Sequence, residues 1–274
     1  EDADNASDLS SNGVYDILLG KENILWVATY GGGINYFDSN RLPFIKIRHR
    51  FNDKNSIVAN FTRSIAEDAN GNLWFGTKKG VSIWNTKKNT WTHIPNLSKN
   101  QNNNQDIVLA LEPDNEFMWI GTYNNGLFKM NINSLKSTHY NVLNNKLLKK
   151  VYAIHKDSKN NIWVGGIEGD LAVINPQDQI ETYPIQQLKS IRENRSGNIL
   201  ITGRYGVYNI NPFTKEFKLI EALKPDKNTL AYSTINSVYE TKNGHLMLAT
   251  NGEGLVFYNP ENQEIKKLTI SSGM

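Results

Sequence analysis

The sequence predicts an all-β fold, a β-propeller of four-stranded antiparallel blades, and three observations predict it. A short segment built around a large apolar residue recurs six times along the 274 residues. Turn residues divide each copy into four short runs of strand-forming residues. The six segments lie 37 to 48 residues apart, which is the period typical of propeller blades.

The anchor of the repeat is a Trp on the second expected strand, as in Gly-Asn-Leu-Trp-Phe-Gly-Thr at residues 71–77. The anchors of the six copies are Trp26, Trp74, Trp119, Trp163, Leu200 and Met247. Nine residues before each anchor stand Ile17, Ile65, Ala110, Ile154, Ile191 and Val238. We expect this frame to hold without gaps in every copy. We also expect the Trp rings to fill the wedge between neighbouring sheets.

The second copy shows how each repeat divides into strands. Its strands are expected at residues 62–67, 73–77, 81–84 and 91–94. Asp68 opens the first turn and is expected to bond backbone N–H groups there, as is Asp157 in the fourth copy. The third, fifth and sixth copies are read as lacking this Asp. The Thr three residues after the anchor is expected to bond within its own turn.

We expect a single propeller domain over residues 1–274. Its repeats are expected at approximately 12–50, 60–97, 105–142, 149–185, 186–222 and 233–270. The first and last copies each have a fourth strand of their own, at residues 44–47 and 265–268, so no spare strand is left at either end. Two ring sizes therefore stay open, six whole blades that close a ring or six blades of a larger one.

Composition excludes several classes of function. The net charge is +3, too small to indicate nucleic acid or a membrane surface as a partner. Cysteine is absent, which excludes disulfides, thiolate nucleophiles and Cys-bound zinc. No run of 18 apolar residues suggests membrane insertion in this segment. We expect neither a cofactor nor a metal: Asp68-Ala69-Asn70-Gly71-Asn72 looks faintly like a calcium loop, but Lys79 stands where such a loop needs Glu.

The repeat resembles the two-component regulator propeller repeat over residues 12 to 270 or so. The second copy carries the resemblance best, through Asn60, Thr62, Ile65, Asp68, Gly71, Leu73, Trp74, Gly76, Thr77 and Gly80. In that family the repeat builds the extracytoplasmic sensor part of large hybrid histidine kinases. These kinases are common in gut Bacteroidetes and control polysaccharide-utilisation genes. Rings in the family usually have about seven blades, which favours a seven-bladed ring as the alternative size.

The resemblance implies a role for the chain. We expect a ligand-sensing, carbohydrate-responsive domain on the periplasmic or extracellular side of the inner membrane, and no catalysis in this segment. The implied partners are an oligosaccharide ligand, neighbouring sensor domains of the same chain and a second copy in a homodimer. A protein-interaction or dimerisation scaffold is the alternative, and a propeller lyase is a further one.

Loop geometry indicates where a ligand would bind. In a propeller, the loop between the second and third strands and the segment leading into the first strand share one face. Tyr rings stack on sugars there, and Arg, Lys and Asn donate to hydroxyl or acidic groups. The candidate ligand-binding residues are Tyr30, Arg63, Lys78, Tyr123, Asn124, Lys150, Glu168, Arg204, Tyr205 and Asn251.

No catalytic signature accompanies these candidates, and we expect no catalytic residue. The sequence contains no His-Glu-x-x-His, Gly-x-Ser-x-Gly or phosphate-loop motif. A lyase needs an acid and a base that converge at the channel. Three of the five His residues, His49, His93 and His139, fall on or just past outer strands, which disfavours the lyase alternative.

Overall fold

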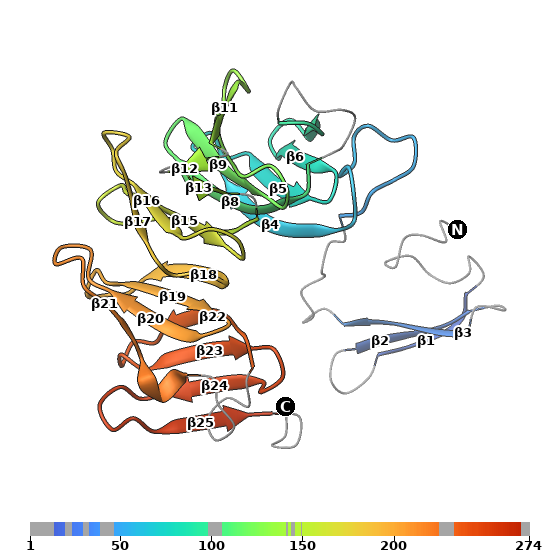
Figure 1. Ribbon diagram of the computed structural model, residues 1–274. Coiled ribbons are helices and arrows are strands. Elements are labelled where there is room, and N and C mark those ends of the chain that lie inside the picture. Colours follow the sequence, from blue (N-terminus) through green and yellow to red (C-terminus); the bar gives the residue numbers. More distant parts are fainter. Residues whose placement is uncertain are drawn as a thin grey trace. The chain divides into compact units, whose positions relative to one another are not determined.

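The structure, a computed structural model, describes residues 14–19, 24–29, 33–38, 47–97, 106–140, 142–143, 146–148, 150–224 and 233–269. Contacts divide the chain into two compact units, Glu1–Ile47 and Arg48–Met274, and each unit is described by itself. Figure 1 numbers the strands and colours them along the chain. The expected single domain over residues 1–274 stays a prediction.

The first unit contains a three-stranded antiparallel sheet in its described part. Its strands are β1 (Val14–Leu19), β2 (Ile24–Thr29) and β3 (Gly33–Asp38), paired in chain order. The fourth strand expected at residues 44–47 lies outside the described residues, except for its last position.

The described residues of the second unit form five four-stranded antiparallel sheets, each with its strands paired in chain order. The first two are β4 (Thr62–Glu67), β5 (Leu73–Thr77), β6 (Gly80–Asn85) and β7 (Thr90–Ile94), then β8 (Val108–Asp114), β9 (Phe117–Thr122), β10 (Leu127–Asn131) and β11 (Ser137–Tyr140). The middle one is β14 (Val151–Lys156), β15 (Ile162–Gly166), β16 (Leu171–Ile174) and β17 (Ile180–Tyr183). The last two are β18 (Leu188–Glu193), β19 (Ile199–Gly203), β20 (Gly206–Ile210) and β21 (Phe217–Leu219), then β22 (Ile235–Glu240), β23 (Leu246–Thr250), β24 (Leu255–Tyr258) and β25 (Ile265–Leu268).

These strands fall where the second to sixth repeats predict them. Two small elements were not expected: a hairpin of β12 (Val142–Leu143) and β13 (Lys146–Leu147), and a 3-10 turn, η1 (Glu221–Leu223). Both lie between sheets or after a fourth strand, in segments whose sequence carries no periodic pattern.

The turn between the second and third strands explains the Thr of the repeat. Thr77 Oγ1 donates to the C=O of Gly80 at 2.9 Å and accepts the N–H of Lys79 at 3.0 Å. Thr122 and Thr250 make equivalent bonds in their own turns. The expected role of this Thr is therefore confirmed. Gly80 has φ +86°, a left-handed value that Gly adopts at little cost.

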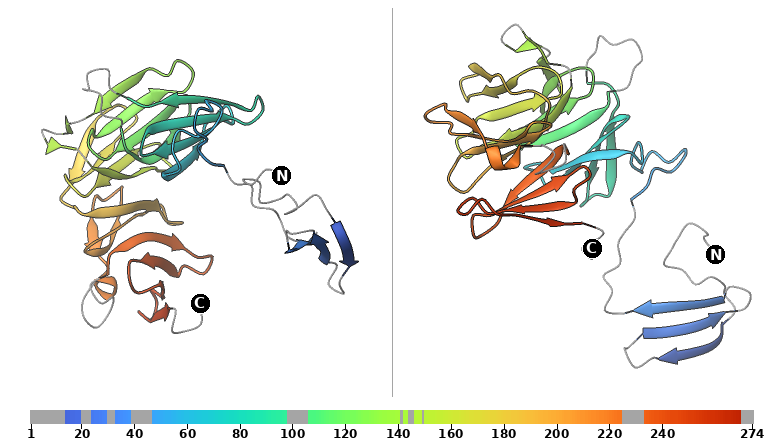
Figure 2. Two further views of the ribbon diagram at one scale, coloured as in Figure 1. Left: turned by 90° about the vertical axis from the view of Figure 1, so that its right-hand side faces the viewer. Right: turned by 60° about the horizontal axis from the view of Figure 1, so that its bottom comes forward.

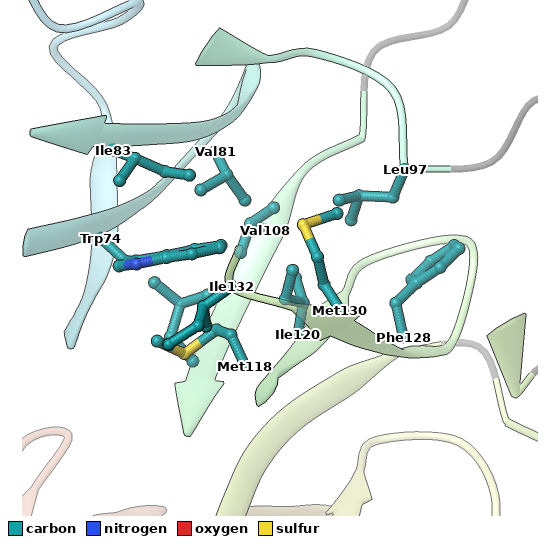
Figure 3. Packing of buried hydrophobic residues seen from close by; sticks show 11 residues of the cluster. Trp74, Val81, Ile83, Leu97, Val108, Met118, Ile120, Phe128, Met130 and Ile132 are labelled. Carbon is teal, nitrogen blue, oxygen red and sulfur yellow. The ribbon is translucent and has the colours of Figure 1, made fainter. Parts of the chain in front are cut away.

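Successive sheets pack through the anchor residues, as the sequence predicts. Trp74 of β5 is fully buried among residues of its own sheet and of the next one, including Val108, Met118 and Ile120. Figure 3 shows the Trp74 ring next to these side chains. Trp119 packs in the same way against the sheet that begins with β14. Burial of such rings is worth a few kcal/mol each, so they are a main source of cohesion between sheets.

First strands lie on the inner side of the row of sheets. The strongest contacts between successive sheets join β4 to β8, β8 to β14, β14 to β18, and β18 to β22. Figures 1 and 2 show this succession from three sides. The first strand of each sheet therefore faces its neighbours' first strands, and the fourth strand lies outermost.

The Gly two residues after the anchor allows this close approach. A Cβ on Gly121 would lie 2.6 Å from Cγ1 of Val151, on the first strand of the next sheet. Gly76 stands in the same relation to Val108, and Gly165 to Leu188. The Gly of the repeat is therefore required by packing between sheets.

The third copy departs from the expected frame by one residue. Leu111, and not Ala110, pairs with the residue after the anchor, as Ile65 and Ile154 do in their copies. Pro113 pairs with Met118, just before the anchor, as Glu67 pairs with Leu73 in the second copy. Four residues separate the first pair and five separate the second, so the connection is one residue shorter in the third copy. The expectation of a frame without gaps is wrong for this copy because a shorter turn shifts every residue before it.

Because of the frame shift, the sequence pattern did not show that this copy repeats the Trp–Asp hydrogen bond of the second and fourth copies. Trp119 Nε1 donates to Oδ2 of Asp114 at 3.2 Å. Trp74 and Trp163 donate in the same way to Asp68 and Asp157, each at 2.8 Å. The statement that the third copy lacks the Asp is therefore wrong, because Asp114 occupies that place. Trp74, Trp119 and Trp163 therefore each have an Asp acceptor in the turn before their own strand.

The first sheet of the second unit has one face that other residues of Arg48–Met274 leave open. Ile65 on β4 is 66% exposed, whereas Leu111, Ile154, Ile191 and Val238, which pair at the same register position in their own sheets, are buried. The difference arises because each of the other four sheets packs on the sheet before it in this unit.

Candidate ligand-binding face

A repeated backbone hydrogen bond joins two loops at one end of every sheet in Arg48–Met274. The residue that follows the second strand donates its N–H to the C=O of the residue immediately before the first strand. The five pairs are Lys78 to Phe61 (3.1 Å), Tyr123 to Ile107 (2.9 Å), Ile167 to Lys150 (3.3 Å), Arg204 to Gln187 (3.1 Å) and Asn251 to Thr234 (2.9 Å). Because the first strands of successive sheets are neighbours, these loop pairs lie on one side of the row. We call this side the loop face.

One group of predicted residues on the loop face surrounds Phe61. The guanidinium carbon of Arg63 and the ammonium of Lys78 each lie 5.9 Å from the centroid of this ring. Phe61 itself is exposed. The two cations therefore share one aromatic surface, an arrangement with a weak cation–π attraction at an exposed position.

A second group joins two neighbouring sheets. Lys150, which precedes β14, donates to Glu168 Oε1 on the turn between β15 and β16. Its ammonium lies 5.4 Å from the ring centroid of Tyr123, on the turn after β9. The bond to Glu168 raises the pKa of Lys150. Three predicted residues are thus brought together as a cation held by a carboxylate and an aromatic ring.

The remaining predicted residues lie on separate turns. Arg204 and Tyr205 stand between β19 and β20, and Asn124 and Asn251 stand after β9 and β23. Tyr30 lies outside the described residues. That any of the ten residues holds a ligand stays a prediction.

Every first strand carries a β-bulge near its start. The register shifts at the second residue of each first strand: between Val14 and Asp16, Thr62 and Ser64, Val108 and Ala110, Val151 and Ala153, Leu188 and Ser190, and Ile235 and Ser237. A bulge leaves one residue unpaired and changes the direction of its side chain. The bulged residues of Arg48–Met274 are Arg63, Leu109, Tyr152, Lys189 and Asn236. They lie on inner strands at the end that bears the loop face.

Two bulged residues that the sequence did not single out are in contact. The ammonium of Lys189 lies 4.2 Å from the ring centroid of Tyr152, on the neighbouring first strand. Burial, with the charge of Arg63 added, lowers the pKa of Lys189. The sequence could indicate these residues only through their place one position after the start of each first strand, since nothing in their own identity marks a bulge.

At the opposite end of the first strands, charges are paired. Lys156 Nζ lies 2.8 Å from Asp114 Oδ1, and both side chains are largely buried. Glu112 accepts the backbone N–H of Lys156 at 2.9 Å, and burial raises its pKa although Arg192 and Lys156 act against this. The inner strands therefore carry a neutralised network at one end and the loop face at the other.

His155 belongs to the paired end and accepts a backbone hydrogen bond from the first strand of the next sheet. Its Nε2 accepts the N–H of Glu193 at 3.1 Å, so the neutral ring carries its proton on Nδ1. Burial, together with the charge of Arg192, lowers the pKa of His155. A protonated ring would lose the bond from Glu193.

We expect the protein to lose stability as the pH falls below 6.5, the ordinary pKa of His, and His155→Gln to reduce that loss. The unfolded chain binds this proton more readily, so the stabilisation is complete above the ordinary pKa and is lost as the pH falls through the lower folded value. Gln offers an oxygen to the Glu193 N–H and does not titrate. Urea unfolding of both proteins at neutral and mildly acidic pH checks this, and equal pH dependence would contradict it.

A shallow hollow of about 320 Å³ opens between the second and third of the five sheets, at the end away from the loop face. It is lined by Asp114, Asn115, Trp119, Lys129, Asn160, Ile162, Ile174, Asn175, Pro176 and Asp178. The ammonium of Lys129 lies 4.6 Å from the Phe117 ring and 4.9 Å from the Trp119 ring. None of the predicted ligand-binding residues lines this hollow.

Two other kinds of feature are absent from the described residues. No group of three or more His, Asp or Glu side chains in the described part is arranged to hold a metal ion. Likewise, no helix in that part is long and apolar enough to cross a membrane.

Two stretches of the chain, residues 8–31 and 56–79, match the two component regulator propeller family. Both stretches resemble that repeat, and they overlap the first parts of the first two copies recognised from the anchor Trp residues. The resemblance read from the sequence is therefore confirmed. Both stretches include the start of a first strand, its bulge and the anchor of the second strand.

A histidine kinase resembles the chain over nearly all of its length. The histidine kinase P4 of Formosa agariphila is 25% identical over 286 residues, which is 97% of this chain. The chain spans only 20% of that relative's own length. The comparison therefore concerns one part of a much longer protein.

Solved structures confirm the β-propeller class. The extracellular domain of a hybrid two component system from B. thetaiotaomicron matches with a TM-score of 0.66 and 23% identity, over 99% of this chain and 42% of that one. An extracellular domain from the same organism, described as that of a one component system, matches with a TM-score of 0.63 and 18% identity, over 98% and 44%. The number of blades in the ring stays a prediction.

Proposed function

We propose that this chain is a ligand-sensing, carbohydrate-responsive propeller region in the extracellular part of a hybrid two-component sensor histidine kinase. The segment binds and transmits, and it carries no catalysis. The observation that carries this proposal is the loop face, where five paired loops bring aromatic rings, cations and amides to one side of the row of sheets. The regulator propeller repeats and the kinase relative support the setting.

The chemistry of the loop face suits a sugar. Aromatic rings offer apolar faces on which a pyranose ring stacks, and Lys, Arg and Asn side chains donate to its oxygens. Tyr123 and Lys150 come from successive sheets and lie in contact. A ligand that binds both would connect the two sheets. Binding on this face would therefore favour one relative position of neighbouring blades, which is a means of passing a signal along the chain.

Calorimetric titration of the protein with a panel of oligosaccharides tests the proposal. We expect at least one to bind, and Tyr123→Ala with Lys150→Ala to weaken that binding about tenfold, the equivalent of about 1.4 kcal/mol. Lys87→Ala, on the exposed turn between β6 and β7 at the opposite end of the strands, is the matched control and should leave binding unchanged. Absence of binding together with a concentration-dependent dimer would favour the scaffold, and turnover of a glycan would favour a lyase.

A further inference from the structure

The bulged residues of the loop face include two cations that have no acidic partner in the part of the chain that the structure describes. No ion pair among the described residues joins Arg63 or Lys189 to a carboxylate. At the other end of the same inner strands Lys156 is paired with Asp114. Elsewhere on the loop face Lys150 is paired with Glu168. The two cations that the bulges place on the inner strands are therefore not neutralised by a carboxylate of the described residues.

These two cations also act on each other. Arg63 on β4 is close enough to Lys189 on β18 for its charge to help lower the pKa of Lys189, after the larger effect of burial. Like charges held near each other in a partly buried place disfavour the charged form of Lys189. An anion placed between them would favour the charged form of Lys189. Two cations that bulges place at the same end of the inner strands, with no carboxylate paired to them among the described residues, are thus suited to a negative ligand.

An aromatic surface lies beside the cations. Tyr152, the bulged residue of β14, lies under the ammonium of Lys189 at 4.2 Å and is half-buried. Phe61 is exposed beside Arg63 at 5.9 Å. Cations next to flat aromatic faces can hold a ring that carries a charged substituent, because the substituent meets the cation while the ring meets the aromatic face. An inorganic anion would contact only the cations and would leave the aromatic faces unoccupied.

We propose that the loop face recognises an acidic sugar, whose carboxylate or sulfate ester is bound by Arg63 and Lys189 and whose ring packs against Tyr152. This inference rests on the proposed carbohydrate-sensing function and specifies the class of sugar. The five bulges of Arg48–Met274 make the site, since each turns one inner-strand residue out of the ladder. Which residue stands at the bulge then decides the chemistry of the face.

Three trisaccharides distinguish the sources of the charge in a calorimetric titration of the whole chain. They are a galacturonic acid trisaccharide, a sulfated galactose trisaccharide and neutral maltotriose. We expect one or both acidic sugars to bind at least tenfold more tightly than maltotriose, with an affinity that falls as salt is added. Arg63→Gln and Lys189→Gln should each reduce this affinity about tenfold. Lys87→Gln makes the same change in net charge at an exposed position of the opposite end and should leave it unchanged.

Each further outcome has a separate meaning. Binding of maltotriose that equals or exceeds binding of both acidic sugars would overturn this inference and leave the carbohydrate-sensing function standing. Acidic-sugar affinity that is equally reduced in Lys87→Gln would also overturn it, because the effect would then be one of net charge. Binding of no sugar at all would overturn the proposed function as well. Thermal unfolding of each variant shows whether the substitutions have affected the fold.

Discussion

We expect Gly121→Val to lower the free energy of unfolding by about 3 kcal/mol or more, since overpacked interiors cost 1 to 3 kcal/mol and sometimes exceed that. The position has ordinary strand geometry, so the backbone itself accepts Val. The obstacle is Val151 on the next sheet, whose Cγ1 would lie 2.6 Å from the new Cβ and whose C=O oxygen would lie 3.0 Å from it. Because one contact is to backbone, β14 as a whole would have to move away from β9. Urea unfolding measures the loss.

Ala249 provides the matched control for this prediction. It stands at the same place in the last repeat, two residues after the anchor Met247, and it is exposed because no described sheet follows its own. We expect Ala249→Val to change the free energy of unfolding by no more than about 0.5 kcal/mol. If Gly121→Val and Ala249→Val had equal effects, close packing between sheets would not be the reason for Gly at this place of the repeat.

Asp68→Ala should lower the free energy of unfolding by about 3 kcal/mol, because it removes the acceptor of several bonds at once. Oδ2 accepts Trp74 Nε1 at 2.8 Å, and Oδ1 accepts the backbone N–H groups of Asn70 and Asn72, each at 2.9 Å. Asp68 is only 6% exposed and Trp74 is fully buried. The indole N–H would therefore be left without a partner away from water.

Substitution of Asn194 separates the loss of the turn hydrogen bonds from the loss of the Trp–Asp hydrogen bond. In the fifth repeat Asn194 accepts the N–H groups of Ser196 and Asn198, but the anchor is Leu200, which has no donor. We expect Asn194→Ala to cost about 1 kcal/mol, the value of a lost turn bond. Comparison of urea unfolding for the two variants isolates the contribution of the Trp–Asp bond. Equal losses would show that the turn alone accounts for the stabilisation.

The carboxyl group of Asp68 also makes the free energy of unfolding depend on acidic pH. Burial opposes the charge of Asp68, but hydrogen bonds from Asn72 and Trp74 outweigh it and hold the pKa of this carboxyl below its ordinary value of 3.8. A depressed pKa contributes stability that is complete above the ordinary value and is lost as the pH falls through the folded one. This acid loss begins below the ordinary value of 3.8, whereas the loss from His155 begins below its ordinary value of 6.5.

Local pattern was enough to predict most strands. Five four-stranded sheets stand where the anchor frame and the turn residues place them, because alternation, Gly and Thr act within a few residues of the chain. The frame was wrong only in the third copy, where a shorter turn shifted Leu111 and concealed Asp114. A one-residue change in turn length is hard to read from sequence when both alignments place apolar residues on the strand.

The site was predictable in outline only. Sequence placed Arg63, Lys78, Tyr123 and Lys150 on loops of one face, and the repeated backbone bonds join those loops within each sheet. Lys189 and Tyr152 were not among the candidates. They are brought together by bulges on two different strands, and a bulge depends on register, which is a property of paired strands.

What the sequence by itself determined is the repeat: its period, its strands, its turn chemistry and its resemblance to regulator propeller repeats. These follow from contacts between residues close together in the chain. Tertiary structure alone decided why Gly follows the anchor, which Asp accepts the indole N–H in the shifted copy, and which loop-face cations lack a carboxylate partner among the described residues. The first and the third depend on residues of different sheets, and the second depends on a change in turn length. Only packing between sheets and pairing between strands bring such residues into contact.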